Sequence, residues 1–282
     1  MIGGMGTPTL FDWPDPGDAA SESGNLCAIG VPADHGNGVS RGASLAPDAI
    51  RRAACSIKKP PFRGVDLGDQ ADCGSLDLDT ILSALRTTTK RVLDMGGRPL
   101  VIGGDHSITF APVSVLQERQ DIGVVWFDAH TDFSPWSEGE VHSHKQVLRR
   151  IEALPGVKRV VQVGYRGITV GDERCLGPKA TVFTTAQARC MPASELLQTM
   201  AEELPWYISV DVDVVDPFQA PGTSAPVPHG LDASVVRDFL SAIVRSRSVV
   251  GADVVEVNPR LDVQGVTCAI AADFLRAIAG GA

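Results

Sequence analysis

Aspartate and histidine residues gather in three short segments, each directly after an apolar run. The segments are Gly103–Ser107 (GGDHS), Asp128–Asp132 (DAHTD) and Ser209–Asp213 (SVDVD). In the second and third segments the acidic and histidine side chains alternate with other residues. Alternate side chains of an extended backbone point to the same side, so Asp128, His130 and Asp132 point together, as do Asp211 and Asp213.

This combination of side chains predicts a metal site. Carboxylates packed so closely would repel each other unless a cation neutralised them. Mixed carboxylate and imidazole ligands suit Mn²⁺, Zn²⁺, Fe²⁺ or Ni²⁺, whereas Mg²⁺ and Ca²⁺ prefer oxygen ligands alone. Each segment by itself has a simpler interpretation, because Asp-x-Asp is often a turn or a helix cap and His106 could be an ordinary loop residue. The occurrence of three such segments in one chain favours the metal site.

Short segments rich in Val and Ile precede these clusters and recur along the chain. The candidate strands are 26–31, 100–103, 123–127, 159–163, 181–183, 207–212 and 249–257. Their nearly continuous apolarity suits parallel strands that are buried on both faces. Candidate helices alternate with them, at 47–56, 80–95, 145–154, 193–203, 233–245 and 265–279. The alternation predicts an α/β fold, a three-layer sandwich around a mostly parallel, doubly wound sheet, which binds ligands at the carboxyl ends of its strands.

Composition limits the other classes of function. The chain of 282 residues carries a formal net charge of -9, which argues against nucleic acid and anionic membranes as partners. Its six cysteines are scattered, so neither a zinc finger nor a disulfide framework is expected. No segment reads as a secretory signal or a membrane span, so we expect a cytoplasmic protein. We expect one domain over residues 1–282, with an irregular N-terminal arm at 1–25.

The three acidic segments resemble the signature motifs of the ureohydrolase family, which includes arginases and agmatinases. Further segments resemble other parts of that family, closer to its agmatinase branch: Gly30–Pro32, Arg41–Ala43, Pro47–Arg51, Val163–Gly167, Asp216–Thr223 and Val254–Pro259. The resemblance covers nearly the whole chain from about Leu26. It implies an arginase/deacetylase-like fold and an enzyme that hydrolyses a guanidino compound to urea and an amine.

The same resemblance implies two Mn²⁺ ions per chain, although Ni²⁺ or Zn²⁺ could occupy the same ligands. One ion would be held by His106, Asp128, Asp132 and Asp211, and the other by His130, Asp128, Asp211 and Asp213. Asp128 and Asp211 would then bridge the two ions. Paired ions lower the pKa of a shared water, which would provide the nucleophile for the guanidinium carbon.

Two catalytic residues are also implied. Glu256 matches the family's glutamate that pairs with the guanidinium, a cation that carboxylates bind bidentately. A salt bridge at a strand end is the alternative role for Glu256. The family also has a histidine that passes a proton to the leaving amine, and both His142 and His144 are candidates. We favour His144 because Leu148–Arg150 follows it as in many agmatinase-like sequences.

The substrate loop departs from the family pattern. His229 stands where a glycine is expected, and the segment from Phe133 to Ser143 matches neither arginases nor agmatinases closely. This segment carries three candidate substrate-binding residues, Trp136, Glu138 and Glu140. The glutamates would attract an amine tail and the tryptophan could pack against it, which favours an agmatine-like substrate. If both glutamates face solvent, arginine or a guanidino acid such as 4-guanidinobutanoate remains open.

Two other hypotheses about function compete with the ureohydrolase hypothesis. A single-zinc amide hydrolase of the deacetylase type shares the fold and an Asp-x-His…Asp set, but it would not need His106, Asp132 and Asp213 as ligands. A non-catalytic subunit of a hetero-oligomer should have lost ligands, and this sequence keeps every position. The expected partners are a small guanidino substrate and further copies of the chain, in a trimer or hexamer.

Overall fold

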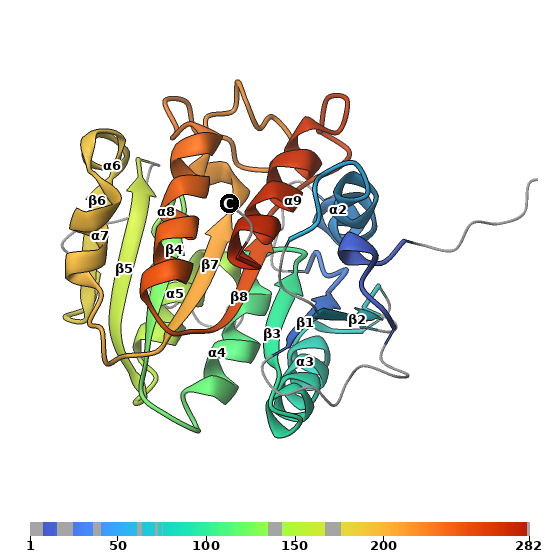
Figure 1. Cartoon of the computed structure of the whole chain (residues 1–282), viewed down its shortest axis with the longest axis horizontal. Helices are drawn as coiled ribbons and strands as arrows, with labels where there is room; N and C mark the ends of the chain where they lie inside the picture. Colours follow the sequence, from blue (N-terminus) through green and yellow to red (C-terminus); the bar gives the residue numbers. More distant parts are fainter. Residues whose placement is uncertain are drawn as a thin grey trace, which may run out of the picture.

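The computed structural model describes residues 8–15, 25–35, 41–60, 64–70, 73–74, 76–134, 143–166 and 176–280. Within them a sheet of eight strands forms the centre of the molecule, in the order β2-β1-β3-β8-β7-β4-β5-β6 (Figure 1). The strands are β1 (Leu26–Gly30), β2 (Gly64–Asp69), β3 (Arg98–Ile102), β4 (Ile122–Phe127), β5 (Val157–Tyr165), β6 (Ala180–Thr184), β7 (Trp206–Asp211) and β8 (Val249–Val255). Every pairing between them is parallel. The predicted α/β fold with a doubly wound sheet is confirmed.

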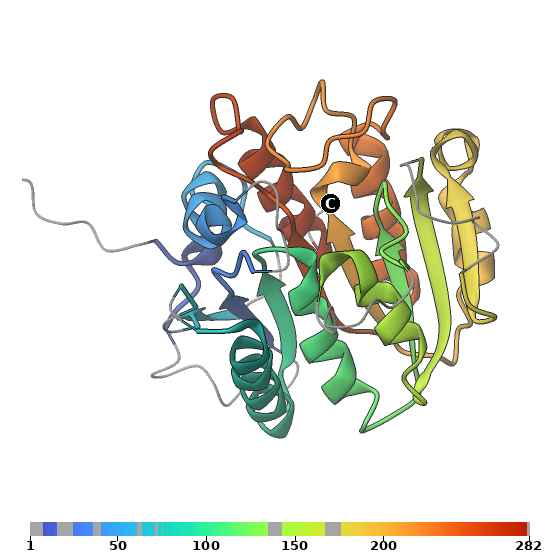
Figure 2. The ribbon, with the colours of Figure 1, turned by 180° about the vertical axis from the view of Figure 1, so that it is seen from behind.

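Helices cover both faces of the sheet and complete three layers. They are α2 (Ala46–Ala54), α3 (Leu78–Asp94), α4 (Phe110–Leu116), α5 (Val147–Glu152), α6 (Thr185–Cys190), α7 (Ala193–Thr199), α8 (Ala233–Ser246) and α9 (Val266–Ile278). Helices α2, α9, α8 and α7 pack side by side on one face (Figure 1). Helices α3, α4 and α5 pack side by side on the other face, as the reverse view in Figure 2 shows.

Burial on both faces explains why the strands are apolar throughout. All six residues of β4 and all six of β7 are buried. A parallel strand between two helical layers has no solvent-facing side, so the alternation of polar and apolar residues disappears. Among the described residues, the largest fully buried side chains are those of Trp126, Trp206 and Tyr207.

The strand order brings the acidic segments together. Strands β3, β8, β7 and β4 are consecutive neighbours in the middle of the sheet. Because all of them run in one direction, their carboxyl ends lie along one edge, where ligands bind in open α/β sheets. The first two acidic segments follow β3 and β4, the third spans the end of β7, and Glu256 follows β8.

Several elements differ from the expectation. Strand β2 was not expected, because Gly64–Asp69 lacks an apolar run. It lies at the edge of the sheet, and its buried Asp66 accepts two hydrogen bonds from the guanidinium of Arg51. Strand β8 ends at Val255, two residues before the expected end at position 257. The backbone of Glu256 has a φ of 61°, which is incompatible with an extended strand. The short helices α4 and α6 also lack a sequence signal, since they have only 7 and 6 residues.

Part of the N-terminal arm packs on the core. Leu10–Asp12 forms one turn of 3₁₀ helix, and Leu10, Phe11 and Trp13 are buried. The backbone N–H of Leu10 donates to Asp66 Oδ2 at 2.7 Å. Residues 1–7 and 16–24 of the arm lie outside the described residues.

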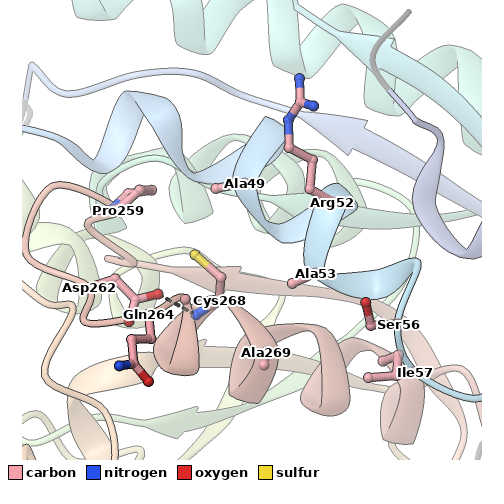
Figure 3. Close-up of a pocket in the computed structure, with 11 residues that line it drawn as sticks. Ala49, Arg52, Ala53, Ser56, Ile57, Pro259, Asp262, Gln264, Cys268 and Ala269 are labelled. Atoms are coloured by element: carbon pink, nitrogen blue, oxygen red, sulfur yellow. Dashed lines mark hydrogen bonds between the residues drawn. The ribbon is translucent and has the colours of Figure 1, made fainter. Parts of the chain in front are cut away.

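The start of α9 is capped from the loop before it. Its N-terminal amides would otherwise lack partners, but Asp262 accepts hydrogen bonds from the N–H groups of Thr267 and Cys268, both at 2.9 Å. Figure 3 shows the contact between Asp262 and Cys268 beside a pocket of about 490 Å³ between α2 and α9. Burial, followed by the contact with Asp262, raises the pKa of Cys268 to about 12, so its thiol stays protonated. None of the candidate metal ligands lines this pocket.

No helix within the described part of the chain is both long and apolar enough to cross a lipid bilayer.

Candidate metal centre

Short turns at the strand ends position the acidic and histidine side chains. His106 begins a 3₁₀ turn after β3, and Asp105 caps that turn by accepting the N–H of Ser107 at 3.0 Å. Asp213 lies in a second 3₁₀ turn, after β7, where Asp211 accepts its N–H at 2.8 Å. Both turns use a carboxylate as a local cap, which fixes where the next side chain points.

The first group of candidate ligands surrounds the ring of His106. Its Nδ1 lies 3.3 Å from Asp128 Oδ2, 3.2 Å from Asp132 Oδ2 and 3.3 Å from Asp211 Oδ2. The residue is fully buried, and among the described residues Nδ1 makes no hydrogen bond of normal geometry. A buried nitrogen that faces three carboxylate oxygens without a partner suits a cation held between them.

The second group surrounds His130. Its Nδ1 lies 2.8 Å from Asp213 Oδ2 and 3.6 Å from Asp128 Oδ1. Asp128 therefore belongs to both groups, and each of its oxygens faces one histidine. This is the arrangement expected of a carboxylate that bridges two ions.

Hydrogen bonds hold Asp128 in this position. Its Oδ1 accepts the backbone N–H of His130 at 2.6 Å, and its Oδ2 accepts the indole N–H of Trp126 at 2.8 Å. The ring of Trp126 also stacks on the ring of His106, with centroids 4.0 Å apart. The sequence pattern did not single out Trp126, although it precedes Asp128 by two residues and so shares its side of the chain.

The close packing of carboxylates and imidazoles shifts their pKa values. Burial, followed by the charge of Asp128, raises the pKa of Asp132 to about 6. Burial lowers the pKa of His130, but its contacts with Asp128 and Asp213 outweigh this and raise it to about 12. The four aspartates of the cluster can carry four negative charges, whereas its two histidines can carry at most two positive charges. The donor set and the unpartnered Nδ1 of His106 fit divalent metal ions.

We expect metal binding to compete with protons. The pKa of His130 is raised, so at neutral pH its ring is protonated in the metal-free protein and must release a proton before it binds an ion. The affinity for Mn²⁺ should therefore rise as the pH rises from about 6 to about 9. Calorimetric titrations in buffers of different ionisation enthalpy would count the released protons. An affinity that is independent of pH, with no proton release, would contradict this assignment of charge.

Glu256 lies beside the first group. Its Oε1 accepts the backbone N–H of His106 at 2.8 Å, and 6% of the residue is exposed. Burial, followed by the charge of Asp105, holds the pKa of Glu256 well above its usual value. Asp132 and Glu256 both have left-handed backbones, with φ of 48° and 61°. Strain of this kind in non-glycine residues is characteristic of functional sites.

The candidate proton-transfer residue lies near the same edge. His144 begins the 3₁₀ turn His144–Gln146, which Ser143 caps by accepting the backbone N–H of Lys145 at 3.1 Å. The backbone N–H of Leu148 donates to the carbonyl oxygen of Asp132 at 3.1 Å, which ties this turn to the acidic segment. The alternative, His142, lies outside the described residues, as do Trp136, Glu138 and Glu140.

Arg166 connects the metal centre to the segment that contains His229, and its role was not expected from the sequence. Its guanidinium donates to the carbonyl oxygens of Asp213 at 2.6 Å and of Val227 at 2.8 Å. His229 has a φ of 65°, a conformation that glycine adopts without strain. The histidine at this position therefore strains the backbone where a glycine would not, although histidine adopts left-handed conformations more readily than most residues.

Comparisons with known proteins agree with this geometry. The family model described as the arginase family matches residues 25–280. A mitochondrial arginase from Medicago truncatula is 34% identical over 89% of this chain and 80% of its own length. A mitochondrial agmatinase from Gallus gallus is 31% identical over 92% of this chain and 82% of its own length. The solved structure of proclavaminate amidino hydrolase from Streptomyces clavuligerus superposes with a TM-score of 0.86 at 28% identity, covering 98% of both chains. The chain therefore belongs to the arginase family of hydrolases, which act on carbon–nitrogen bonds of amidines.

Proposed function

We propose that this protein is a binuclear metal hydrolase that cuts an agmatine-like guanidino compound into urea and an amine. The position of Asp128 carries the proposal, because its two oxygens face two different histidines. One ion would be held by His106, Asp128, Asp132 and Asp211, and the other by His130, Asp128, Asp211 and Asp213. Mn²⁺ is the proposed metal, and Ni²⁺ or Zn²⁺ could use the same ligands.

The chain's own residues divide the remaining tasks. With two divalent ions bound, the site would have an activated water at neutral pH. Glu256 binds the guanidinium, because a buried carboxylate beside the centre gains a partner when that cation enters. His144, in the turn just before Leu148, whose N–H donates to the carbonyl oxygen of Asp132, would pass a proton to the amine as it leaves. Without that proton the leaving group would depart as an unstable anion.

Residues outside the metal centre would select the substrate. The names of the three similar proteins include an arginase, an agmatinase and a proclavaminate amidino hydrolase, so similarity to them does not single out one substrate. The segment after Phe133 offers two carboxylates, at Glu138 and Glu140, and the aromatic ring of Trp136. These residues would attract an amine tail and repel the carboxylate of a guanidino acid. A substrate such as agmatine follows from that charge balance.

A urea-release assay on the Mn²⁺-loaded protein tests this choice. We expect kcat/KM to be higher for agmatine than for 4-guanidinobutanoate or arginine. The double variant Glu138→Gln with Glu140→Gln should lose several-fold of the preference, because the attraction to the amine disappears. The matched control is Glu202→Gln with Glu203→Gln, the same change between α7 and the start of β7, at the opposite end of that strand from the metal centre. A parent that prefers either acid, or a preference unchanged in the double variant, would show that this segment is not the selector.

Metal stoichiometry separates this proposal from a single-zinc hydrolase. We expect two equivalents of metal per active chain. Full activity with one equivalent would favour the single-zinc hydrolase instead. Assembly as a trimer or hexamer and a cytoplasmic location stay predictions. Gel filtration with light scattering would test the first, and fractionation of cells would test the second.

A further inference from the structure

A buried chain of hydrogen bonds runs from the ring of His106 away from the metal centre. The Nε2 of His106 lies 2.9 Å from Ser209 Oγ, and that hydroxyl donates to Asp253 Oδ1 at 2.7 Å. Tyr207 donates its hydroxyl to the other oxygen, Asp253 Oδ2, at 2.8 Å. All four residues are fully buried. Ser209 and Asp253 are directly opposite each other on the neighbouring strands β7 and β8.

We propose that Asp253 and Ser209 are positioning residues that hold the ring of His106 in the one tautomer able to bind metal. The inference rests on the proposed role of His106 as a ligand and extends the site by residues that touch neither ion nor substrate. The direction of the hydrogen bonds carries it. A neutral imidazole has one N–H and one lone pair, and the partner of one nitrogen decides which nitrogen keeps the proton.

The direction begins at Asp253. An ionised carboxylate only accepts hydrogen bonds, so Tyr207 and Ser209 must both donate to it. A serine hydroxyl has a single proton, and because Ser209 donates it in the hydrogen bond to Asp253, its oxygen can only accept a hydrogen bond from His106. The ring must therefore carry its proton on Nε2. Nδ1 is then left with its lone pair, and it is the atom that faces Asp128, Asp132 and Asp211.

The surroundings of the ring leave it little freedom to turn. One face of His106 stacks on Trp126 at an interplanar angle of 7°, and its backbone N–H is held by Glu256. A ring flip would take Nε2 from Ser209 and bring a carbon to the carboxylates. The burial of Asp253 also calls for an explanation, because a carboxylate inside a central strand is costly unless it is hydrogen-bonded. The role of orienting a metal ligand would explain why a buried carboxylate is present at this position. Hydrogen-bond partners of metal-binding histidines commonly have this role.

Two variants and one control test the proposal through metal binding rather than turnover. Ser209→Ala removes the acceptor. Asp253→Asn keeps the size of the side chain but adds donor N–H groups, so Ser209 can reverse and donate to the ring, which favours the wrong tautomer. Both variants should lose about 10- to 100-fold in calorimetric affinity for one of the two Mn²⁺ equivalents. Tyr207→Phe is the matched control, because it removes a hydroxyl from the same network without changing the direction, and it should bind like the parent.

A spectroscopic readout reports the tautomer itself. In the parent loaded with diamagnetic Zn²⁺, the Nε2–H of His106 should appear as a downfield proton that exchanges slowly with solvent. The signal should be lost or shifted in Ser209→Ala and Asp253→Asn, and kept in Tyr207→Phe. Thermal melts identify any variant that does not fold; if Ser209→Ala fails, the comparison of Asp253→Asn with Tyr207→Phe decides.

The outcomes separate this inference from the proposed function. A parent that binds no Mn²⁺ overturns the proposed metal hydrolase. A parent that binds two ions, with folded Ser209→Ala and Asp253→Asn variants of equal affinity, overturns the positioning role alone. A loss in Tyr207→Phe as large as in the other two would also overturn it, since general damage to the network would then explain all three.

Discussion

Replacing Asp128 with asparagine is expected to remove both metal ions and to reduce turnover by about a thousandfold or more. The two carboxylate oxygens face His106 and His130, so each proposed ion depends on one of them. Asparagine has the same size, but it is neutral and offers one oxygen in place of two. Metal analysis by mass spectrometry, together with urea release, measures both effects on the same sample.

The same chemical change at a neighbouring aspartate provides the control. Asp132 belongs to the group around His106 and not to the group around His130, so Asp132→Asn should lose about one ion and keep the other. His130→Ala should also lose about one ion, from the other group. If Asp128→Asn retains both ions while Asp132→Asn loses one, Asp128 does not bridge the two ions.

The positions of the candidate ligands could be predicted because each follows directly from its strand. A run such as Ile122–Phe127 has no polar face, so it must be buried between helices, and its first polar residue marks the carboxyl end. Because β4 and β7 are parallel neighbours, Asp128 and Asp211 reach the same edge of the sheet, although they are 83 positions apart in the sequence. Strand alternation fixes which side chains point together.

The residues behind the ligands could not be predicted in the same way. Ser209 is an ordinary small residue in a buried strand, and Trp126 has the apolar character expected there. Their roles depend on which strands are neighbours, and a local pattern does not contain that information. Asp253 is different, because a carboxylate inside the run Val249–Val255 is a signal that could have been recognised. Its partner strand β7 was needed to say what it binds.

Strand ends and loops were the least predictable elements. The expected strand over 249–257 stops early because Glu256 adopts a left-handed backbone, a conformation that propensity gives no reason to expect for glutamate. The turn does have a consequence for the site. It directs the carboxylate of Glu256 to the amide of His106 instead of along the sheet. Local strain and function thus coincide at a residue that the sequence pattern identified for another reason.

Replacing Glu256 with glutamine is expected to weaken substrate use while leaving the metal content unchanged. Glutamine keeps an oxygen that can accept the N–H of His106, so the turn that carries this ligand should persist. The lost negative charge would otherwise face the guanidinium in a buried site, where removing one partner of a charged pair costs roughly 2–5 kcal/mol. The corresponding fall in kcat/KM is about 30-fold or more.

The comparison with Glu256→Asp distinguishes charge from shape. Aspartate keeps the charge on a shorter side chain, so it should recover part of the affinity for the guanidinium if charge dominates. Because the metals are measured separately, a loss of ions in Glu256→Gln would point to a structural role through His106 instead. A strand-end salt bridge, the other role open to Glu256, predicts a lower melting temperature in both variants with kcat/KM unchanged. Glu256→Gln with parental kcat/KM and full metal content would therefore remove Glu256 from the substrate site.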